Sequence, residues 1–370
     1  MERFETVIIG GGQAGLATGH VLSTRGRSFV ILDAHQRVGD AWRTRWDSLR
    51  VFTPSMVSAL PGMPFPGPRF SFPTKDEVAD YLEAYAKRFM MPVRTGVRVD
   101  RLYRDGGRFV ISSNAGTFEA DNVVVATGAH HTPKIPAFAG ELHPNIVQLH
   151  SSEYRRPSQL REGPAVVVGL GNSGAEIAYD LRGGERHVFV AGSPVAQLPV
   201  RHGSAAFFMV APLIATISKY VMTVDNPIGR KALPKFHAAP LVRIRLKELA
   251  AAGIERVARV SGARDGMPLL ADGRTLDVAN VIWCTGFRTD LSWIDLPAAF
   301  RPDGGLDQYR GVACAVPGLY FMGMWQQYAQ ASDLLPGVGR DAAYVARSLG
   351  ARVDSEHRVV GRDAAEVGVR

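Results

Sequence analysis

The sequence predicts an α/β protein of two similar units, each built from a parallel sheet covered by helices. One glycine pattern, G-x-G-x-x-G, occurs twice, at residues 10–15 (GGGQAG) and 169–174 (GLGNSG). Each copy follows a run of β-branched residues and precedes a helical pattern, the context that makes the motif specific. A strand end is also repeated, as ATG at 126–128 and CTG at 284–286. Duplicated starts and ends indicate that the second unit is inserted into the first.

The glycine spacing has the same physical reason in both copies. The first glycine permits a tight strand-to-helix turn, the second lets a pyrophosphate approach the backbone, and the third lets the helix pack closely. The helix N-terminus then offers free N–H groups to the phosphates. We therefore expect two Rossmann-like dinucleotide-binding domains of the three-layer ββα, glutathione-reductase-like type. The expected contacts are Gly10, Gly12, Gln13, Ala14 and Gly15, and then Gly169, Gly171, Asn172, Ser173 and Gly174.

The two copies differ after their helices. In the first, a strand at 28–32 ends at Asp33 and Ala34, near the position, about 20 residues on, where a carboxylate binds ribose hydroxyls. An acid there suits FAD or NAD, although an ordinary exposed strand-end Asp is the alternative. In the second copy, the strand at 187–191 continues into Gly192 and Ser193 without an acid or an arginine. The nearest bases are Arg201 and His202, so the choice between NADPH and NADH stays open, with a slight preference for NADPH.

Composition excludes several classes of protein. A chain of 370 residues with 46% hydrophobic and 21% charged residues suits two or three soluble domains. No apolar run reaches the ~18 residues of a membrane span, because the longest candidate, 205–217, contains Pro212. The chain starts directly in a strand, so we expect a cytoplasmic protein without a signal peptide. The net charge of +8 is scattered, which argues against nucleic acid and fits the binding of two pyrophosphates.

Cysteine and histidine usage argues against thiol and metal chemistry. The two cysteines, Cys284 and Cys314, form no C-x-x-C pair, so the chain lacks the dithiol of disulfide reductases. His130 and His131 are adjacent in sequence, and adjacent side chains rarely point the same way, so we expect no metal site. Both cysteines are expected to be small buried hydrophobic residues.

The order of the segments gives the expected domains. Residues 1–157 and 285–370 form a discontinuous FAD-binding domain, and 158–284 form an NAD(P)H-binding domain with a helical insertion at about 203–250. The irregular stretch 37–75 is either a functional loop or a surface cover. A last helix at 338–349 follows Pro336 and Gly337, and its N-terminal dipole would suit the flavin pyrimidine edge.

Six motifs in fixed order resemble the flavin-containing monooxygenases, class B flavoprotein monooxygenases, over nearly the whole chain. The resemblance is to small bacterial members and plant YUCCA-type enzymes. The motifs are GGGQAGL at 10–16, GDAWR at 39–43, PGMPFP at 61–66, ATGAHH at 126–131, GLGNSG at 169–174 and CTGFR at 284–288.

The resemblance has two departures. The family segment F-x-G-x-x-x-H-x-x-x-[YFW] keeps His150 and Tyr154, but Pro144 and Ile146 replace its Phe and Gly. Many members also place an Asn, which helps to hold the oxygenated flavin, where Phe52 and Thr53 stand here.

The resemblance implies an FAD-dependent enzyme that consumes NAD(P)H and transfers one oxygen atom of O₂ through a flavin (hydro)peroxide. The substrate would be a small sulfide, amine or ketone. An oxidase or reductase releasing H₂O₂ and a flavin-binding sensor without turnover are the alternatives, and a homodimer is not excluded. Asn172, Ser173, Phe52 and Thr53 are the candidate catalytic residues, with helix capping as the alternative for Asn172 and Ser173. The remaining candidate cofactor contacts are Trp42, Arg43, Thr127, Gly128, Ser193, Arg201, Thr285, Gly286, Gln327 and Leu334.

Overall fold

The computed structural model describes residues 1–129, 132–182, 186–193, 195–236 and 239–367, with side chains described up to 354. The larger sheet has a parallel centre in the order β18-β6-β1-β2-β3. Its strands are β1 (Glu2–Ile9), β2 (Phe29–Leu32), β3 (Val93–Arg94), β6 (Gly116–Val125) and β18 (Leu319–Phe321). An antiparallel extension adds β4 (Val99–Asp105) and β5 (Arg108–Ser113) beside β6. The short strands β16 (Gln308–Tyr309) and β17 (Val312–Ala313) continue the edge beyond β18.

Helices cover this sheet on one side. The helix α1 (Gln13–Ser23) packs along α8 (Leu335–Val367), and α3 (Lys75–Arg88) lies beside α1. The α3 helix begins with a capping box between Thr74 and Glu77, as its sequence requires. Its apolar positions Val78, Tyr81, Leu82 and Tyr85 are fully buried in the shared core. These layers of sheet, antiparallel extension and helices fit the predicted ββα class.

The smaller sheet is entirely parallel, in the order β11-β10-β9-β14-β8. Its strands are β8 (Val147–His150), β9 (Ala165–Val168), β10 (Val188–Ala191), β11 (Glu255–Val257) and β14 (Asn280–Trp283). The helices α4 (Asn172–Asp180) and α7 (Leu246–Ala251) pack together on it. A hairpin of β12 (Val260–Arg264) and β13 (Met267–Leu270) completes this unit. Apolar strands with both faces covered are typical of such sheets.

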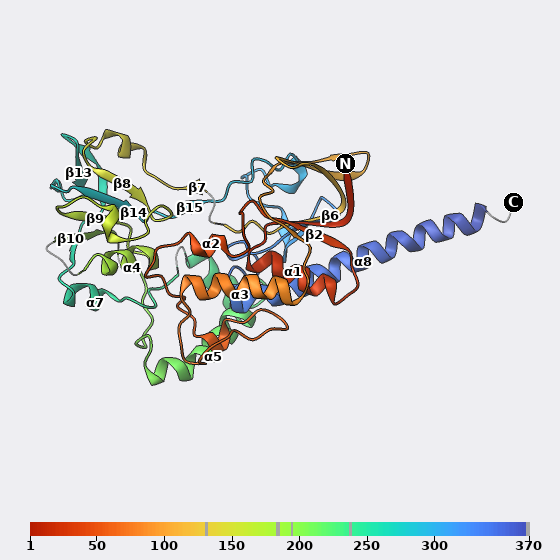
Figure 1. The fold of residues 1–370 in the computed structure, drawn as a ribbon, viewed down its shortest axis with the longest axis horizontal. Helices are drawn as coiled ribbons and strands as arrows, with labels where there is room; N and C mark the ends of the chain where they lie inside the picture. The colour runs from red at the N-terminus through yellow and green to blue at the C-terminus, as the bar shows by residue number, and fades with distance from the viewer. Residues whose placement is uncertain (130–131, 183–185, 194, 237–238, 368–370) are drawn as a thin grey trace.

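Two crossing segments join the units side by side (Figure 1). The strand β7 (Thr132–Pro133) pairs antiparallel with β15 (Phe287–Arg288) between the two sheets. The strand β8, which falls within the predicted range 1–157, pairs with β14 in the smaller sheet. The smaller sheet therefore begins before residue 158, because β8 needs β14 as its hydrogen-bonding neighbour. The assignment of a cofactor to each unit stays a prediction.

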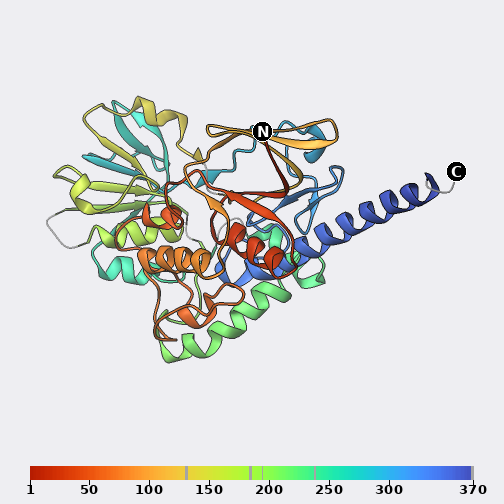
Figure 2. The ribbon, with the colours of Figure 1, turned by 45° about the vertical axis from the view of Figure 1, so that its right-hand side comes forward.

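The insertion is helical, with α5 (Ala205–Tyr220), α6 (Pro227–Ala232) and a short helical turn at Leu233–Lys235. Pro212 lies inside α5, one turn or more from either end, without breaking it. Figure 2 shows α5 on the outside of the molecule, away from both sheets.

The last helix is longer than the predicted 338–349. It begins at Leu335, with Pro336 in its first turn, and runs to Val367. No proline follows Pro336, so no residue of the strongest helix-breaking type ends it earlier. Its C-terminal part extends away from the body of the molecule (Figures 1 and 2). Among the described residues, no helix has both the length and the apolar character to cross a membrane.

Candidate functional site

The first glycine loop lies where three strand ends of the larger sheet meet. Gly10 has a φ of 111°, and a Cβ on it would stand 2.5 Å from the carbonyl oxygen of Ala126, after β6. A Cβ on Gly15 would stand 1.9 Å from the carbonyl oxygen of Gly10. A Cβ on Gly12 would meet no described atom within 4 Å. The first and third glycines are thus required by the fold, whereas the second faces open space.

The second glycine loop repeats this geometry. Gly169 has a φ of 115°, and an added Cβ would lie 2.2 Å from the carbonyl oxygen of Cys284. A Cβ on Gly174 would lie 1.8 Å from the carbonyl oxygen of Gly169, and one on Gly171 would again meet nothing described. Gly12 and Gly171 are the N-cap residues of α1 and α4, and neither helix has a side-chain cap or an acid in its first turn. Both helix N-termini therefore keep N–H groups for an anion.

Asp33 lies at the end of β2 and faces the first loop. Its Oδ2 accepts a 2.7 Å hydrogen bond from the Gly11 amide, and its Oδ1 accepts one of 2.8 Å from the His35 amide. Burial alone would raise the pKa of Asp33, but the hydrogen bonds from His35 and Gly11 outweigh it and keep that pKa below its usual value. The carboxyl is thus held ionised and in contact with the loop, as a ribose acceptor requires. The next candidate, Ala34, is exposed.

A chain of hydrogen bonds connects the first loop with the 37–75 segment and with α8. The indole Nε1 of Trp42 donates to Gln13 Oε1 at 3.3 Å, and Gln13 Nε2 donates to the Asp333 carbonyl at 3.1 Å. Trp42 also packs against the cores of both units. The irregular segment is therefore a bridge between the units rather than only a cover.

Asp333, which motif analysis did not select, is half-buried at the entry to α8, with its Oδ1 shielded from solvent. Among the described residues, its Oδ1 has no hydrogen-bond partner, and burial raises the pKa of the carboxyl to about 7. A buried polar oxygen without a partner is costly and rare. The signal in the sequence is faint: one acid in an apolar stretch, two residues before a helix. Together with the open Gly12 and the bonded Asp33, this unpartnered oxygen beside Gln13 fits a site that FAD completes.

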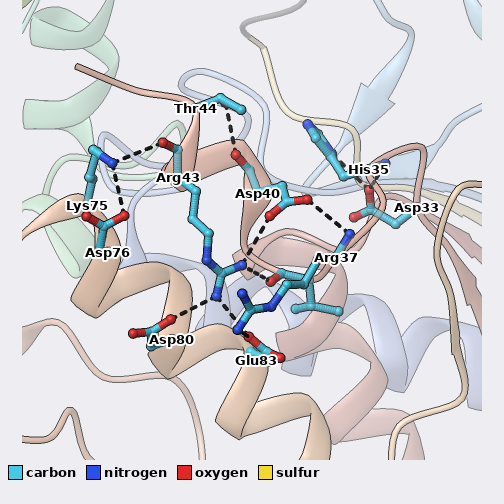
Figure 3. Close-up of polar contacts among 11 residues, drawn as sticks. Asp33, His35, Arg37, Asp40, Arg43, Thr44, Lys75, Asp76, Asp80 and Glu83 are labelled. Carbon is cyan, nitrogen blue, oxygen red and sulfur yellow. Dashed lines mark hydrogen bonds and ion pairs between the residues drawn. The ribbon is translucent and has the colours of Figure 1, made fainter. Parts of the chain in front are cut away.

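Arg43, an expected cofactor contact, is hydrogen-bonded to several protein groups. Its guanidinium donates to Asp80 Oδ1 and Glu83 Oε2, each at 2.8 Å, and to the Val38 carbonyl at 2.7 Å. Figure 3 shows Arg43 directed at the acidic face of α3, with Asp40 of α2 (Asp40–Arg43) beside it. Arg43 therefore fastens the bridging segment to α3, and its contact with a cofactor stays a prediction.

Asn172, an expected catalytic residue, is bonded to the backbone of a distant segment. Its Nδ2 donates to the Pro240 carbonyl at 2.9 Å, and its Oδ1 accepts from the Val242 amide at 3.1 Å. Both ends of the amide thus hold the 240–242 segment, so Asn172 positions that segment and is not a helix cap, while its contact with a cofactor stays a prediction. Ser173 is half-buried at the start of α4, which leaves its role a prediction.

The segment that Asn172 holds carries basic residues toward the second loop. Residues 196–198, after β10, pair in parallel with Leu241. Arg243 Nη1 bonds to the buried Glu176 of α4 at 2.8 Å. Ser193 and Arg201 are both exposed on the same stretch after β10. Arg243 therefore brings a guanidinium to α4, the helix that begins at the second loop, where it is paired with Glu176.

Gln327, another expected cofactor contact, is bonded to the backbone after β18. It is buried, its Nε2 donates to the Phe321 carbonyl at 2.8 Å, and its Oε1 accepts from the Met324 amide. Its amide thus closes the turn after β18, and its contact with flavin stays a prediction. Leu334 is half-buried at the entry to α8, beside Asp333, and its contact with flavin stays a prediction.

Phe52 and Thr53 lie at an aromatic cluster between the bridging segment and α5. His202 stacks on Phe72, with ring centroids 3.8 Å apart, and its Nε2 donates to the Phe52 carbonyl at 3.2 Å. Phe207 of α5 contacts both rings. Burial lowers the pKa of His202 to about 4, so its ring is neutral. Thr53 Oγ1 is bonded to Ser58 Oγ at 2.8 Å.

The remaining candidates lie at the two crossing segments. Thr127 and Gly128 follow β6, whereas Thr285 and Gly286 follow β14, and the hydroxyl of Thr285 bonds to the Lys134 carbonyl. His150 Nε2 donates to the Gly286 carbonyl at 3.0 Å. The retained His of the family segment therefore holds the junction of the units. His130 and His131 lie outside the described residues.

Both cysteines are free, and Cys284 is held against the second loop. Burial raises the pKa of Cys284, which leaves it a protonated thiol, while Cys314 is exposed, unlike our expectation of burial. No group of three His, Cys, Asp or Glu side chains in the described ranges could hold a metal ion.

The comparisons with known proteins support the fold and the class of enzyme. Residues 7–198 match the family model described as pyridine nucleotide-disulphide oxidoreductase. The oxidoreductase CzcO of Bacillus subtilis is 37% identical, over 94% of this chain and 99% of the relative. Indole-3-pyruvate monooxygenase YUCCA1 of Oryza sativa is 27% identical, over 94% and 93%. The flavin-containing monooxygenase of Stenotrophomonas maltophilia superposes with a TM-score of 0.74 at 29% identity, covering 95% of this chain and all of that one.

Two nucleotide loops on a doubled α/β fold, without a dithiol, define a flavin-dependent oxidoreductase. The chain belongs to the pyridine nucleotide-disulphide oxidoreductase family and, within it, to the enzymes of the flavin-containing monooxygenase type.

Proposed function

We propose that the chain is an FAD-dependent monooxygenase that uses NADPH or NADH and O₂ to oxygenate a small neutral substrate. The observation that carries the proposal is the pair of equivalent loops in which only the middle glycine, Gly12 or Gly171, borders open space. One loop has the carboxyl of Asp33 beside it, whereas Gly192 and Ser193, without an acid, follow the corresponding strand of the other. This inequality supports FAD at the first loop and the nicotinamide nucleotide at the second.

The proposed division of labour follows from the contacts. When bound, flavin would supply the redox chemistry, accepting hydride from the nicotinamide and passing electrons to O₂. Asp33 would accept the ribose hydroxyls, while the N–H groups after Gly12 would bind the pyrophosphate. Asp333 and Gln13 would orient the flavin end of FAD. Trp42 would hold the two units in a fixed relative position. Per turnover, NAD(P)H, a proton, O₂ and substrate give NAD(P)⁺, water and the oxygenated product.

The proposed substrate class is a sulfide, an amine or a ketone without net charge. The support is the aromatic cluster beside Phe52, where His202 is neutral and the neighbours Phe72, Phe207 and Phe208 are apolar. A charged substrate would lose its hydration there without a paired group, which is costly.

The test is a balance of products in air. The FAD-loaded enzyme is supplied with NADPH or NADH, and nucleotide consumption, H₂O₂ and oxygenated product are measured with a thioether, a tertiary amine and a cyclic ketone. We expect product to account for most of the nucleotide consumed with at least one substrate. The proposal is wrong if all consumed nucleotide appears as H₂O₂ with every substrate.

The second candidate is an NAD(P)H oxidase that releases H₂O₂. It is favoured by the loop at Phe52 and Thr53, where no amide side chain stands and the Thr53 hydroxyl is already bonded to Ser58. The same balance distinguishes the two functions.

A further inference from the structure

The outward face of α5 is apolar along its whole length. At helical spacing, Met209 is 77% exposed, Leu213 59%, Ile217 38% and Tyr220 57%. Ala205, Ala206 and Pro212 are exposed with them, and Thr216 is the exposed polar residue of this stripe. Exposed large apolar side chains are normal singly, but a continuous stripe of them marks an interaction surface.

The fold explains why this face stays uncovered. The opposite face of α5 is occupied, because Phe207 and Ala211 are buried against Phe72 and Val242. The helix is anchored at its start, where the Ser204 hydroxyl caps the Phe207 amide. The stripe therefore belongs to a firmly packed helix on the outside of the molecule (Figure 2) and is not a loose segment.

Positive charge borders the stripe at both ends. Arg201 is exposed before α5, and Lys219 lies in its last turn. Arg230, Lys231 and Lys235 are exposed on and just after α6, where Ile228 is 61% exposed. Asp225 is the only acidic residue from 201 to 247, and both of its oxygens accept hydrogen bonds from Tyr309 or Tyr328.

From this arrangement we propose that α5 and the start of α6 dock the enzyme on an anionic lipid surface, with the apolar stripe in the acyl boundary and the basic residues at the headgroups. An apolar helix face bordered by Lys and Arg is the form that interfacial binding takes. Self-association through this face is disfavoured. Two copies of the face would bring like charges together on a protein of net charge +8.

The docking surface packs on the aromatic cluster, through Phe207 and Phe208, and so lies next to the loop at Phe52. Lipid binding at α5 would therefore place the candidate substrate region near the membrane. The docking itself does not depend on the proposed reaction, so its test needs no turnover.

The experiment is co-sedimentation of the purified FAD-loaded enzyme with vesicles of phosphatidylcholine alone or mixed with phosphatidylglycerol. We expect binding to the anionic vesicles and its loss in Met209→Glu/Leu213→Glu. Arg230→Gln and Lys231→Gln should each weaken binding about fivefold, the effect of one base near an anionic surface. Met90→Glu is the matched control, because Met90 is 88% exposed in the turn after α3.

Retained flavin absorbance shows that each variant is folded. The proposal is overturned if the wild type does not bind anionic vesicles, binds neutral vesicles equally, or loses binding equally in Met90→Glu. It is also overturned if light scattering shows a wild-type dimer that becomes monomeric in the α5 double variant, because the occupant is then a second copy.

Discussion

Without FAD, the Asp333 side chain has an unsatisfied oxygen, and we expect bound FAD to satisfy it. Its unpartnered Oδ1 destabilises the folded protein until a ligand donates to it. We predict that Asp333→Ala raises the free energy of unfolding of the FAD-free protein by about 1–3 kcal/mol, the cost of an unsatisfied buried polar group. The same variant should bind FAD at least roughly tenfold more weakly.

Thermal unfolding and flavin fluorescence titration measure these two effects. Asp333→Asn, which keeps the size and an acceptor oxygen, is the control for packing. If Asp333→Ala destabilises the FAD-free protein and leaves FAD affinity unchanged, the residue is only structural.

The variant Asn172→Ala tests whether Asn172 positions the 240–242 segment or acts in catalysis. Because both ends of its amide hold the backbone of 240–242, Asn172→Ala should lower the free energy of unfolding by about 1–3 kcal/mol. The KM for NADPH should rise, since the basic 240–245 segment loses its support. Ser173→Ala, one residue on, should leave stability unchanged in the same denaturation experiment. A stable Asn172→Ala enzyme with normal flavin reduction but no oxygen transfer would restore the catalytic role.

At the scale of elements, the contact between the bridging segment and α5 depends on pH through His202. Its folded pKa of about 4 lies below the ordinary value of 6.5, so the folded state binds fewer protons than the unfolded state. The stability from this contact is present above pH 6.5 and is lost as the pH falls toward 4. Denaturation between these pH values should show a loss of at most about 3 kcal/mol that His202→Gln reduces. An unchanged slope in that variant would assign the acid sensitivity elsewhere.

The elements differ in how far they follow from sequence. The strand–loop–helix units at residues 10–15 and 169–174 were predictable, because their glycines are fixed by contacts within one turn and one neighbouring strand. Motif analysis selected Arg43 and Gln327 as cofactor contacts but did not predict the protein groups that bind them. Arg43 reaches Asp80 and Glu83, far along the chain, and Gln327 turns inward to Phe321. Such choices depend on packing between distant segments, which local spacing does not encode.

Two features, Asp333 and the outward face of α5, could not be predicted from the sequence, and the reason is the same for both. Asp333 can be selected as a site candidate only from the fold, because Gln13, more than 300 residues away, bonds to its carbonyl. The residues of α5 were predicted only as part of a helical insertion, and only the fold shows which of its apolar side chains face outward. Burial is a property of the assembled molecule.

At the scale of the whole molecule, the two glycine loops allow the cofactors to be removed one at a time. Gly12 and Gly171 have negative φ values of −77° and −84°, and an added Cβ meets no described atom. Gly12→Ala and Gly171→Ala should therefore fold normally. We expect Gly12→Ala to lose bound FAD, and Gly171→Ala to keep FAD but weaken NAD(P)H binding at least about tenfold, as clash with a pyrophosphate would do.

Flavin content and nucleotide titration of the two purified variants check this division. Gly15→Ala is the contrasting control, because its Cβ would overlap the Gly10 carbonyl and disturb the fold itself. Loss of FAD in Gly171→Ala but not in Gly12→Ala would reverse the assignment of the two loops.

The central claim is that electrons pass from a nucleotide at the second loop to FAD at the first. Anaerobic rapid mixing with NADPH and, separately, NADH tests it most directly, with the visible absorbance of oxidised flavin as the signal. We predict that at least one nucleotide bleaches the wild-type flavin, and that Gly171→Ala bleaches at least about tenfold more slowly at limiting nucleotide. The claim is contradicted if neither nucleotide bleaches the wild-type flavin. It is also contradicted if the flavin of Gly171→Ala is bleached at the wild-type rate.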